Sequence, residues 1–217
     1  MILTPDQHIV FFGDSVTDCD RDRESPGDPG LGLGYVRICH SLLQAWQPQS
    51  RFRITNRGIS GDRIYDLEDR LQRDVIDMRP NVVSLLIGIN DTWQRYGSHQ
   101  RTSPIPAFTA SYRRILTKIR TDTEAGIILC EPFVLPVPDD RRAWREDLDP
   151  RILAIRDLAE EFRTEFLPLD TILTAAARQQ PAEVWAPDGV HPSAAGHGLI
   201  ARAWLDLAQA MPSFQGP

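Results

Sequence analysis

The sequence has only three cysteines, Cys19, Cys39 and Cys130, in 217 residues. They form no CxxC pair, and an odd number of cysteines without a secretory leader argues against a disulfide framework. We therefore expect three reduced thiols.

A long hydrophobic run and a targeting segment are also missing. Residues 1–8 contain no basic region followed by an apolar stretch, and a run of about eighteen apolar residues, the length that spans a membrane, occurs nowhere. These absences predict a soluble protein of the cytoplasm.

Neither sign of charge is concentrated in one part of the chain. The formal net charge is −6, with acidic and basic residues interleaved, so we expect neither a nucleic-acid partner nor a membrane partner. Hydrophobic residues make up 41% of the chain, which is enough for one core. No linker or repeat is visible, which predicts a single domain over residues 1–217.

Short apolar runs alternate with segments of helical periodicity. The predicted strands are residues 8–13, 52–56, 82–88, 126–131 and 165–169. The predicted helices are residues 35–46, 64–78, 107–121, 152–163 and 194–211. This alternation predicts a parallel sheet between two layers of helices, a three-layer α/β sandwich.

Polar turns that contain glycine follow the first three predicted strands. They are Gly13-Asp14-Ser15, Asn56-Arg57-Gly58-Ile59-Ser60-Gly61 and Gly88-Ile89-Asn90-Asp91. Open parallel sheets bind ligands beyond the carboxyl ends of their strands, so we expect these turns to meet at one edge.

A carboxylate and an imidazole precede the last predicted helix. Asp188 and His191 are three residues apart, so one turn of chain can bring them into contact. Such an aspartate fixes the tautomer of the histidine and leaves the far ring nitrogen free to take a proton from a serine. Ser15 is the candidate nucleophile. The candidate donors to a developing oxyanion are the N–H groups of Ser15 and Gly58 and the side-chain amide of Asn90.

In order and spacing, four motifs resemble the sequence blocks of the SGNH (GDSL) hydrolases: Gly13-Asp14-Ser15, Asn56-x-Gly58-x-x-Gly61, Gly88-x-Asn90-Asp91 and Asp188-x-x-His191. The blocks span nearly the whole chain. The resemblance implies that Ser15 is the nucleophile, with Asp188 and His191 as its triad partners. It also implies an oxyanion hole of Ser15, Gly58 and Asn90, and a flavodoxin-like sheet of five parallel strands in the order 2-1-3-4-5.

Longer segments are similar to a subgroup of bacterial acetylxylan esterases. They are GDSVTDC at 13–19, GLGYV at 32–36, GISG at 58–61, GINDTW at 88–93 and HPSAAGH at 191–197. This similarity implies removal of acetyl groups from xylo-oligosaccharides, with a small acylated sugar as the substrate. It also implies a homo-oligomer, and we expect no cofactor.

Four further side chains are candidates for contact with a substrate: Asp14, Trp93, Tyr96 and Trp185. Aromatic rings beside a cleft can stack on the apolar faces of sugars, and they can equally form a wall of the core. For Asp14 we favour a structural role, in which the carboxylate anchors its turn through backbone hydrogen bonds, and we interpret Asp91 in the same way.

The histidines outside the proposed triad predict no metal site. His197 follows His191 by six residues, which is not a zinc-ligand spacing, no HExxH motif is present, and the cysteines are scattered. We expect His197 to cap or to pack. His8, His40 and His99 are expected at the surface or at the edge of the core.

Several features stay open at the level of sequence. Arg57 and Arg63 either orient aspartates or contact the substrate, and residues 20–34 form either a rim over the cleft or an ordinary connection. The charged run at 139–147 is interpreted as a solvated face, with Trp144 as a candidate subunit contact.

The main hypothesis is an ester hydrolase that works through an acyl-enzyme and prefers short acyl groups, because no long apolar insertion is present to hold a fatty tail. The runner-up is a lysophospholipase or acyl-thioesterase of the same superfamily. A third hypothesis is a non-catalytic binding module or a receiver-like regulator on the same sheet. A receiver needs an acidic cluster after the first strand and a lysine near the last, an arrangement that this sequence does not have.

Overall fold

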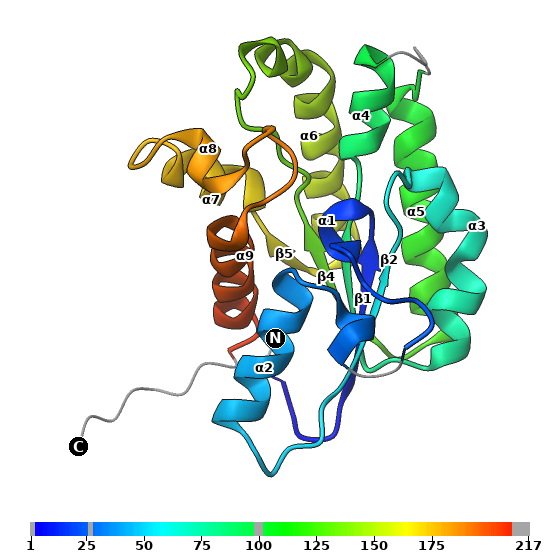
Figure 1. Ribbon diagram of the computed structural model, residues 1–217. Helices are drawn as coiled ribbons and strands as arrows, with labels where there is room; N and C mark the ends of the chain where they lie inside the picture. The colour runs from blue at the N-terminus through cyan, green and yellow to red at the C-terminus, as the bar shows by residue number, and fades with distance from the viewer. Residues whose placement is uncertain (1–2, 26–27, 98–101, 210–217) are drawn as a thin grey trace.

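The computed structural model describes residues 3–25, 28–97 and 102–209. Within these ranges, five parallel strands form one sheet in the order β2-β1-β3-β4-β5 (Figure 1). The strands are β1 (His8–Gly13), β2 (Arg53–Gly58), β3 (Val82–Leu86), β4 (Gly126–Cys130) and β5 (Glu165–Leu167). The predicted parallel sheet and its strand order are confirmed.

Helices cover both faces of this sheet. They are α1 (Ser15–Asp18), α2 (Tyr35–Trp46), α3 (Ile64–Asp74), α4 (Ile89–Tyr96), α5 (Ile105–Asp122), α6 (Arg145–Phe162), α7 (Leu169–Ala176), α8 (Ala182–Trp185) and α9 (Ala194–Leu207). Short 3-10 turns occur at η1 (Asp28–Leu31), η2 (Ile76–Met78) and η3 (Asp139–Trp144). Helices α2 and α9 lie on one side of the sheet, and α3, α5 and α6 lie on the other (Figure 1). The predicted three-layer sandwich is therefore confirmed.

The alternation of side chains along β1 divides the core between the two faces. Ile9 and Phe11 belong to the hydrophobic cluster under α2 and α9, where Phe11 packs 5.0 Å from the ring of Trp204. Val10 and Phe12 belong to the cluster under α3, α5 and α6. Both faces of the central strand are thus buried, as expected of a parallel sheet.

Strand register brings the polar turns to one edge. Gly13 at the end of β1 pairs with Gly58 at the end of β2 and with Leu86 at the end of β3. The segments that follow these three residues therefore leave the sheet side by side. No helix in the described ranges is long and apolar enough to cross a membrane.

The helix predicted at 152–163 begins earlier, at Arg145. Pro150 lies inside it, and charged residues fill its first turns. Asp147 stabilises this part of the helix because it accepts hydrogen bonds from Arg151 one turn later (3.0 Å) and from Arg95 on α4 (2.9 Å). Together, the contact within α6 and the contact with α4 outweigh the helix-breaking tendency of the proline.

The other boundaries differ less. The segment predicted at 64–78 ends as a helix at Asp74 and continues as η2, whereas α5 extends the prediction at 107–121 at both ends. Helix α9 ends at Leu207, and residues 210–211 of the predicted last helix lie outside the described residues. Helices α1, α4, α7 and α8 were not predicted.

The interpretation of Trp144 as a subunit contact is wrong. Its side chain is only 3% exposed, because it packs in a cluster with Val134 and Val190 inside the same chain. The neighbouring Asp139, Asp140 and Arg142 are exposed, so the predicted solvated face is confirmed for these residues.

Candidate active site

Ser15 is the first residue of α1, directly after the end of β1. The preceding Asp14 is the N-cap, whose Oδ1 accepts a hydrogen bond from the N–H of Val16 (3.0 Å). Gly13 must be small, because a Cβ there would lie 2.5 Å from the carbonyl oxygen of Leu86 and from Oγ1 of Thr17. This close packing holds Ser15 at the mouth of the turn, where it is partly exposed.

The turn before α9 presents His191. Oδ1 of Asp188 accepts hydrogen bonds from the N–H groups of Val190 (3.0 Å) and His191 (2.7 Å), which closes a compact turn. Gly189 in this turn has φ of 82°, and a Cβ there would lie 2.4 Å from the carbonyl oxygen of Val137. Glycine therefore lets the turn pack directly against the segment at 135–137.

A continuous hydrogen-bonded chain joins the three predicted residues. Oγ of Ser15 lies 3.0 Å from Nε2 of His191, and Nδ1 of His191 lies 2.6 Å from Oδ2 of Asp188. With the carboxylate accepting from Nδ1–H, the neutral ring has a free lone pair on Nε2 that accepts the serine proton. The side chains of His191 and Asp188 are 46% and 40% exposed, so the chain of residues is open to an incoming ligand.

Asp188 and His191 shift each other's pKa values toward the charged forms. The hydrogen bond that Nδ1–H of His191 donates to Asp188 raises the pKa of His191 above its ordinary value of 6.5, against the opposing effect of desolvation. Partial burial raises the pKa of Asp188, but the hydrogen bonds from the ring and backbone of His191 and from Val190 outweigh it and hold this pKa well below its usual range. The carboxylate therefore stays ionised while the imidazole takes up and releases a proton.

Only some of the predicted oxyanion donors are available. The N–H of Ser15 belongs to the first turn of α1, where helix geometry provides no acceptor. The side chain of Asn90 donates one hydrogen bond from Nδ2 to the carbonyl oxygen of Asp62 (3.0 Å), and its second N–H is free of a described partner. The N–H of Gly58, in contrast, donates to Oδ1 of Asn56 (2.8 Å).

Gly58 has a packing role instead. It is buried, and a Cβ there would lie 2.2 Å from the backbone nitrogen of Asp18 and 2.6 Å from the carbonyl carbon of Thr17. The second glycine of this turn, Gly61, is exposed, has φ of 88°, and a Cβ on it would meet nothing within 4 Å. Its N–H makes no hydrogen bond to another described residue. The sequence motif contains both Gly58 and Gly61. Which of them has a free N–H depends on the hydrogen bond from Gly58 to Asn56.

Asp14 does not reach the surface. Its side chain is buried at 1% exposure, so it anchors the turn as expected, and its proposed contact with a substrate is contradicted. Burial raises the pKa of Asp14 to about 7, and Oδ2 has no hydrogen-bond partner among the described residues. Asp91 is also structural, because it accepts hydrogen bonds from the N–H of Ile64 (3.1 Å) and the hydroxyl of Ser103 (2.8 Å).

The three aromatic candidates have different surroundings. The ring of Trp93 is partly buried and its centre lies 5.7 Å from that of His191. Tyr96 stacks on Trp144 with ring centres 5.8 Å apart, and its hydroxyl donates to the carbonyl oxygen of Ala143 (3.0 Å). Trp185 is partly buried against the core cluster under α2 and α9. Among the described ring contacts of these three side chains, that of Trp93 is the one that reaches a triad residue.

His197 packs in the core, as predicted. Its Nδ1 accepts a hydrogen bond from the N–H of Tyr35 (3.2 Å), its ring stacks on the Tyr35 ring, and Sγ of Cys19 lies 3.3 Å from Nε2. Burial lowers the pKa of His197 to about 4, so the ring is neutral at pH 7. Cys19, Cys39 and Cys130 are free thiols, as predicted.

The structure describes the surroundings of two of the three remaining histidines. His8 is buried at the start of β1 and contacts Oγ1 of Thr55 (2.9 Å), and His40 is partly exposed on α2. His99 lies outside the described residues.

The structure also shows the contacts of Arg57, Arg63 and the segment at 20–34, whose roles the sequence left open. Nε of Arg57 donates to Sδ of Met78 (3.4 Å), and Arg63 lies over the ring of Tyr65 (5.5 Å). In the described part of the segment at 20–34, Arg21 donates to the carbonyl oxygen of Gly58 (2.7 Å), so this segment packs on the end of β2.

The parallel sheet and the Ser-His-Asp chain at its carboxyl edge define a hydrolase of the α/β class with a serine at the first strand exit. Residues 11–199 match the model of the GDSL-like lipase/acylhydrolase family. The chain belongs to this family and is a carboxylic ester hydrolase, as the sequence motifs predicted.

Two relatives show how far the likeness extends. The chain is 35% identical over 204 residues, 92% of each chain, to an acetylxylan esterase of Geobacillus stearothermophilus. A crystal structure of that enzyme has a TM-score of 0.88 at 32% identity, over 98% of this chain and 100% of the other. A protein of Parabacteroides merdae described as a GDSL-like lipase has a TM-score of 0.91 at 34% identity, over 96% and 98% of the two chains.

Proposed function

We propose that the chain removes acetyl groups from O-acetylated carbohydrates, through an acyl-enzyme on Ser15. The observation that carries the proposal is the hydrogen-bonded chain from Ser15 through His191 to Asp188, with distances of 3.0 and 2.6 Å. A serine hydroxyl is a weak nucleophile until a neighbouring base takes its proton. His191 has the position and the free ring nitrogen for this step.

The proposed reaction has two half-reactions. Oγ of Ser15 attacks the acyl carbon while its proton passes to Nε2 of His191, which then protonates the departing sugar oxygen. Water, deprotonated by the same nitrogen, attacks the acyl-enzyme and releases the acid. Asp188 holds the imidazole in the required tautomer and stabilises the imidazolium during both steps.

For the oxyanion we propose the N–H of Ser15, the side chain of Asn90 and the N–H of Gly61. Gly61 replaces Gly58 in this proposal because the N–H of Gly58 is occupied by Asn56 (2.8 Å). The side chain of Asn90 donates to the carbonyl oxygen of Asp62, and Asp62 directly follows Gly61 in the chain. The two proposed donors are therefore close to each other. Fixed donors of this kind stabilise the tetrahedral intermediate most strongly when they need no reorganisation.

The choice of substrate rests on the relatives and on the ring beside the triad. The 35% identical Geobacillus protein is an acetylxylan esterase. Trp93 offers a ring 5.7 Å from His191, in a position to pack against a sugar face. A short acyl group is favoured because the sequence has no long apolar insertion to hold a fatty tail.

Acetate release from acetylated xylo-oligosaccharides tests this function. We expect release by the wild type, none above background by Ser15→Ala, and labelling of Ser15 by a fluorophosphonate probe in the wild type alone. Hydrolysis of p-nitrophenyl acetate without acetate release from the oligosaccharides would refute the carbohydrate assignment and leave the esterase. An unlabelled Ser15 would refute the nucleophile.

A lysophospholipase or acyl-thioesterase remains the alternative from the same superfamily. Comparing p-nitrophenyl acetate with p-nitrophenyl palmitate separates the two, because only a site that holds a long apolar chain gains from the longer ester. We expect the acetate to react faster.

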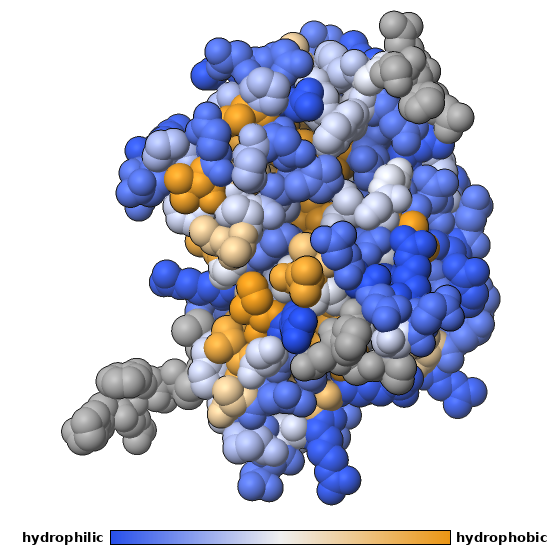
Figure 2. All heavy atoms as spheres, viewed as in Figure 1, coloured by the Kyte–Doolittle hydropathy of each residue, from blue (hydrophilic) through white to orange (hydrophobic). Residues whose placement is uncertain are grey.

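Three wider expectations belong to the same proposal. One sheet with a core cluster on each face supports a single domain over residues 1–217. The three free thiols fit the reducing cytoplasm. Apolar surface gathers in the middle of the face shown in Figure 2, and exposed Leu33, Leu153 and Val184 support self-association, which sedimentation velocity measures directly.

A further inference from the structure

A pocket of about 530 Å³ lies between η3 and α7. Residues Val134 and Pro136 form one wall, and Arg141, Arg142 and Arg145 reach it from η3 and the start of α6. Its other side comes from α7 and the residue pair after it, with Asp170, Thr171, Thr174, Ala175 and Arg178. The volume is in the range of sites for small organic ligands.

The lining is strongly basic in an acidic protein. Four arginines and a single aspartate line the pocket, whereas the whole chain has a formal charge of −6. The aspartate is already neutralised, because Arg145 donates to both oxygens of Asp170 (2.6 and 2.9 Å). Three guanidinium groups remain, of which Arg141 is paired with Asp140 at 3.6 Å.

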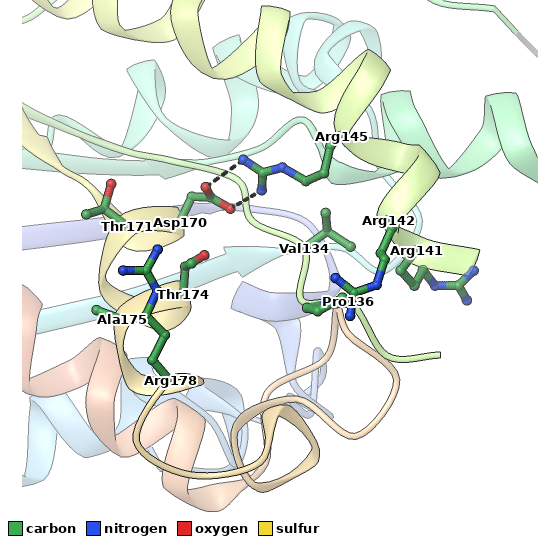
Figure 3. A pocket seen from close by; sticks show the side chains of 10 residues that line it. All are labelled: Val134, Pro136, Arg141, Arg142, Arg145, Asp170, Thr171, Thr174, Ala175 and Arg178. Carbon is green, nitrogen blue, oxygen red and sulfur yellow. Dashed lines mark hydrogen bonds and ion pairs between the residues drawn. The ribbon is translucent and has the colours of Figure 1, made fainter. Parts of the chain in front are cut away.

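Two of these guanidinium groups are available to a ligand. Figure 3 shows Arg142 and Arg178 on opposite walls of the pocket. Arg178 has no ion-pair partner among the described residues, and Arg142 meets only Asp139 at 3.5 Å, with both side chains largely exposed. Such an exposed pair contributes little, so it does not compete with a bound anion. A guanidinium fork binds a carboxylate through two parallel hydrogen bonds, so each of these two side chains can serve as the anchor of an acidic ligand.

The pocket is adjacent to the proposed catalytic residues. The N–H of Leu135, between Val134 and Pro136, donates to the carbonyl oxygen of Gly189 (2.8 Å), two residues before His191. Arg141 lies 5.1 Å from the ring centre of Trp93, and this same ring lies 5.7 Å from that of His191. Each of these steps is about the length of one sugar residue.

The other lining groups suit a saccharide. Thr171 and Thr174 offer hydroxyls that can bond to sugar hydroxyls, and Val134 and Pro136 offer an apolar wall for a ring face. A free inorganic anion has no use for this apolar wall, whereas a sugar acid contacts both kinds of surface.

We propose that this pocket binds the carboxylate of an acidic sugar, so that the substrate is an acetylated oligosaccharide with a uronate substituent. The inference rests on the proposed function, because it specifies the saccharide that the esterase acts on. Arg142 and Arg178 bind the carboxylate, and the acetylated residue extends past Arg141 and Trp93 toward Ser15.

Equilibrium binding to the Ser15→Ala variant tests the pocket without turnover. The probes are a xylo-oligosaccharide with one glucuronic acid substituent, the same oligosaccharide without it, and inorganic phosphate, measured by titration calorimetry. We expect the acidic oligosaccharide to bind about tenfold more tightly than the neutral one, and this preference to vanish when Arg142→Gln and Arg178→Gln are added. Arg202→Gln, an exposed change on α9 outside the pocket, is the matched control and keeps the preference.

Each result decides the inference. Equal binding of the two oligosaccharides overturns it even if the wild type releases acetate. Phosphate binding as tightly as the acidic oligosaccharide also overturns it, in favour of a free-anion site. Preferential acidic binding that depends on the two arginines, in a protein whose wild type hydrolyses no acetyl ester, supports the pocket while the proposed function fails.

Discussion

The guanidinium of Arg70 donates a hydrogen bond from Nη2 to the carbonyl oxygen of Gly13 (3.0 Å), two residues before Ser15. The same buried group donates to the carbonyl oxygen of Arg57 (2.8 Å) and pairs with Asp62 (2.7 Å) and Asp74 (2.9 Å). A single side chain on α3 thus connects the ends of β1 and β2, where Ser15 and the glycine turn at 58–61 follow the strands.

We expect Arg70→Met to lower the free energy of unfolding by about 3 kcal/mol or more, because it leaves buried carboxylates and carbonyls without a donor. The catalytic efficiency on p-nitrophenyl acetate falls as well, since the strand ends lose their common support. Arg73→Met is the matched control: Arg73 pairs with the same Asp74 but is 73% exposed, so its loss changes the stability little. Equal losses in urea unfolding of the two variants would contradict this role of Arg70.

A second prediction concerns the pH dependence of the reaction. His191 must be neutral to accept the serine proton, and the hydrogen bond with Asp188 raises its pKa above 6.5. Activity of the wild type therefore rises with pH through a value above 6.5. In Asp188→Asn the charged partner is lost, so the acidic limb of kcat/KM moves to lower pH.

The rate in Asp188→Asn also falls, on the order of 10²- to 10⁴-fold, because the amide no longer fixes the tautomer. The measurement is kcat/KM for p-nitrophenyl acetate between pH 5 and 9, with Ser15→Ala as the background. An unchanged acidic limb would show that Asp188 does not set the protonation of His191.

A third prediction separates an oxyanion donor from a packing residue. Asn90→Ala is expected to lower kcat by about 10²- to 10³-fold with a small change in KM, because the lost N–H acts on the transition state. Gly58→Ala is expected to lower the melting temperature together with the activity, since its Cβ has no room beside Asp18. A higher KM with an unchanged kcat in Asn90→Ala would argue against the proposed donor.

The sheet was predictable because parallel strands that are buried on both faces consist of continuous apolar runs in the sequence. The predicted start and end of β1 are those of the structure, and the other strands shift by a few residues. Helix α4 was not predicted, because Gly88-Ile89-Asn90-Asp91 has the composition of a turn. Its first turn is stabilised from outside, where Asp91 accepts the N–H of Ile64 at the start of α3.

The candidate site was predictable for a different reason. Asp188 and His191 lie three residues apart in one turn, which brings them into contact, and Ser15 directly follows the first strand of the sheet. Which glycine N–H is free was not predictable, because two glycines share one motif and the side chain of Asn56 accepts the N–H of Gly58 (2.8 Å). The arginines of the pocket were not predicted as a group, because α7 and η3 are distant in sequence and meet only in the folded chain.

The last prediction concerns Asp14 and the stability of the fold. Burial raises the pKa of Asp14 to about 7, whereas an unfolded aspartate has a pKa of 3.8. Between these values the native state binds the proton and the unfolded state does not. Protonated Asp14 therefore contributes its whole stabilisation below pH 3.8. This contribution to the free energy of unfolding falls as the pH rises toward 7, by about 1.4 kcal/mol per pH unit at most.

Asp14→Asn keeps an oxygen for the N–H of Val16 and cannot ionise, so we expect a shallower loss of stability between pH 4 and 7 in urea unfolding. A slope identical to that of the wild type would mean that Asp14 is ionised in the native state across this range, and that its unpaired oxygen finds a donor there.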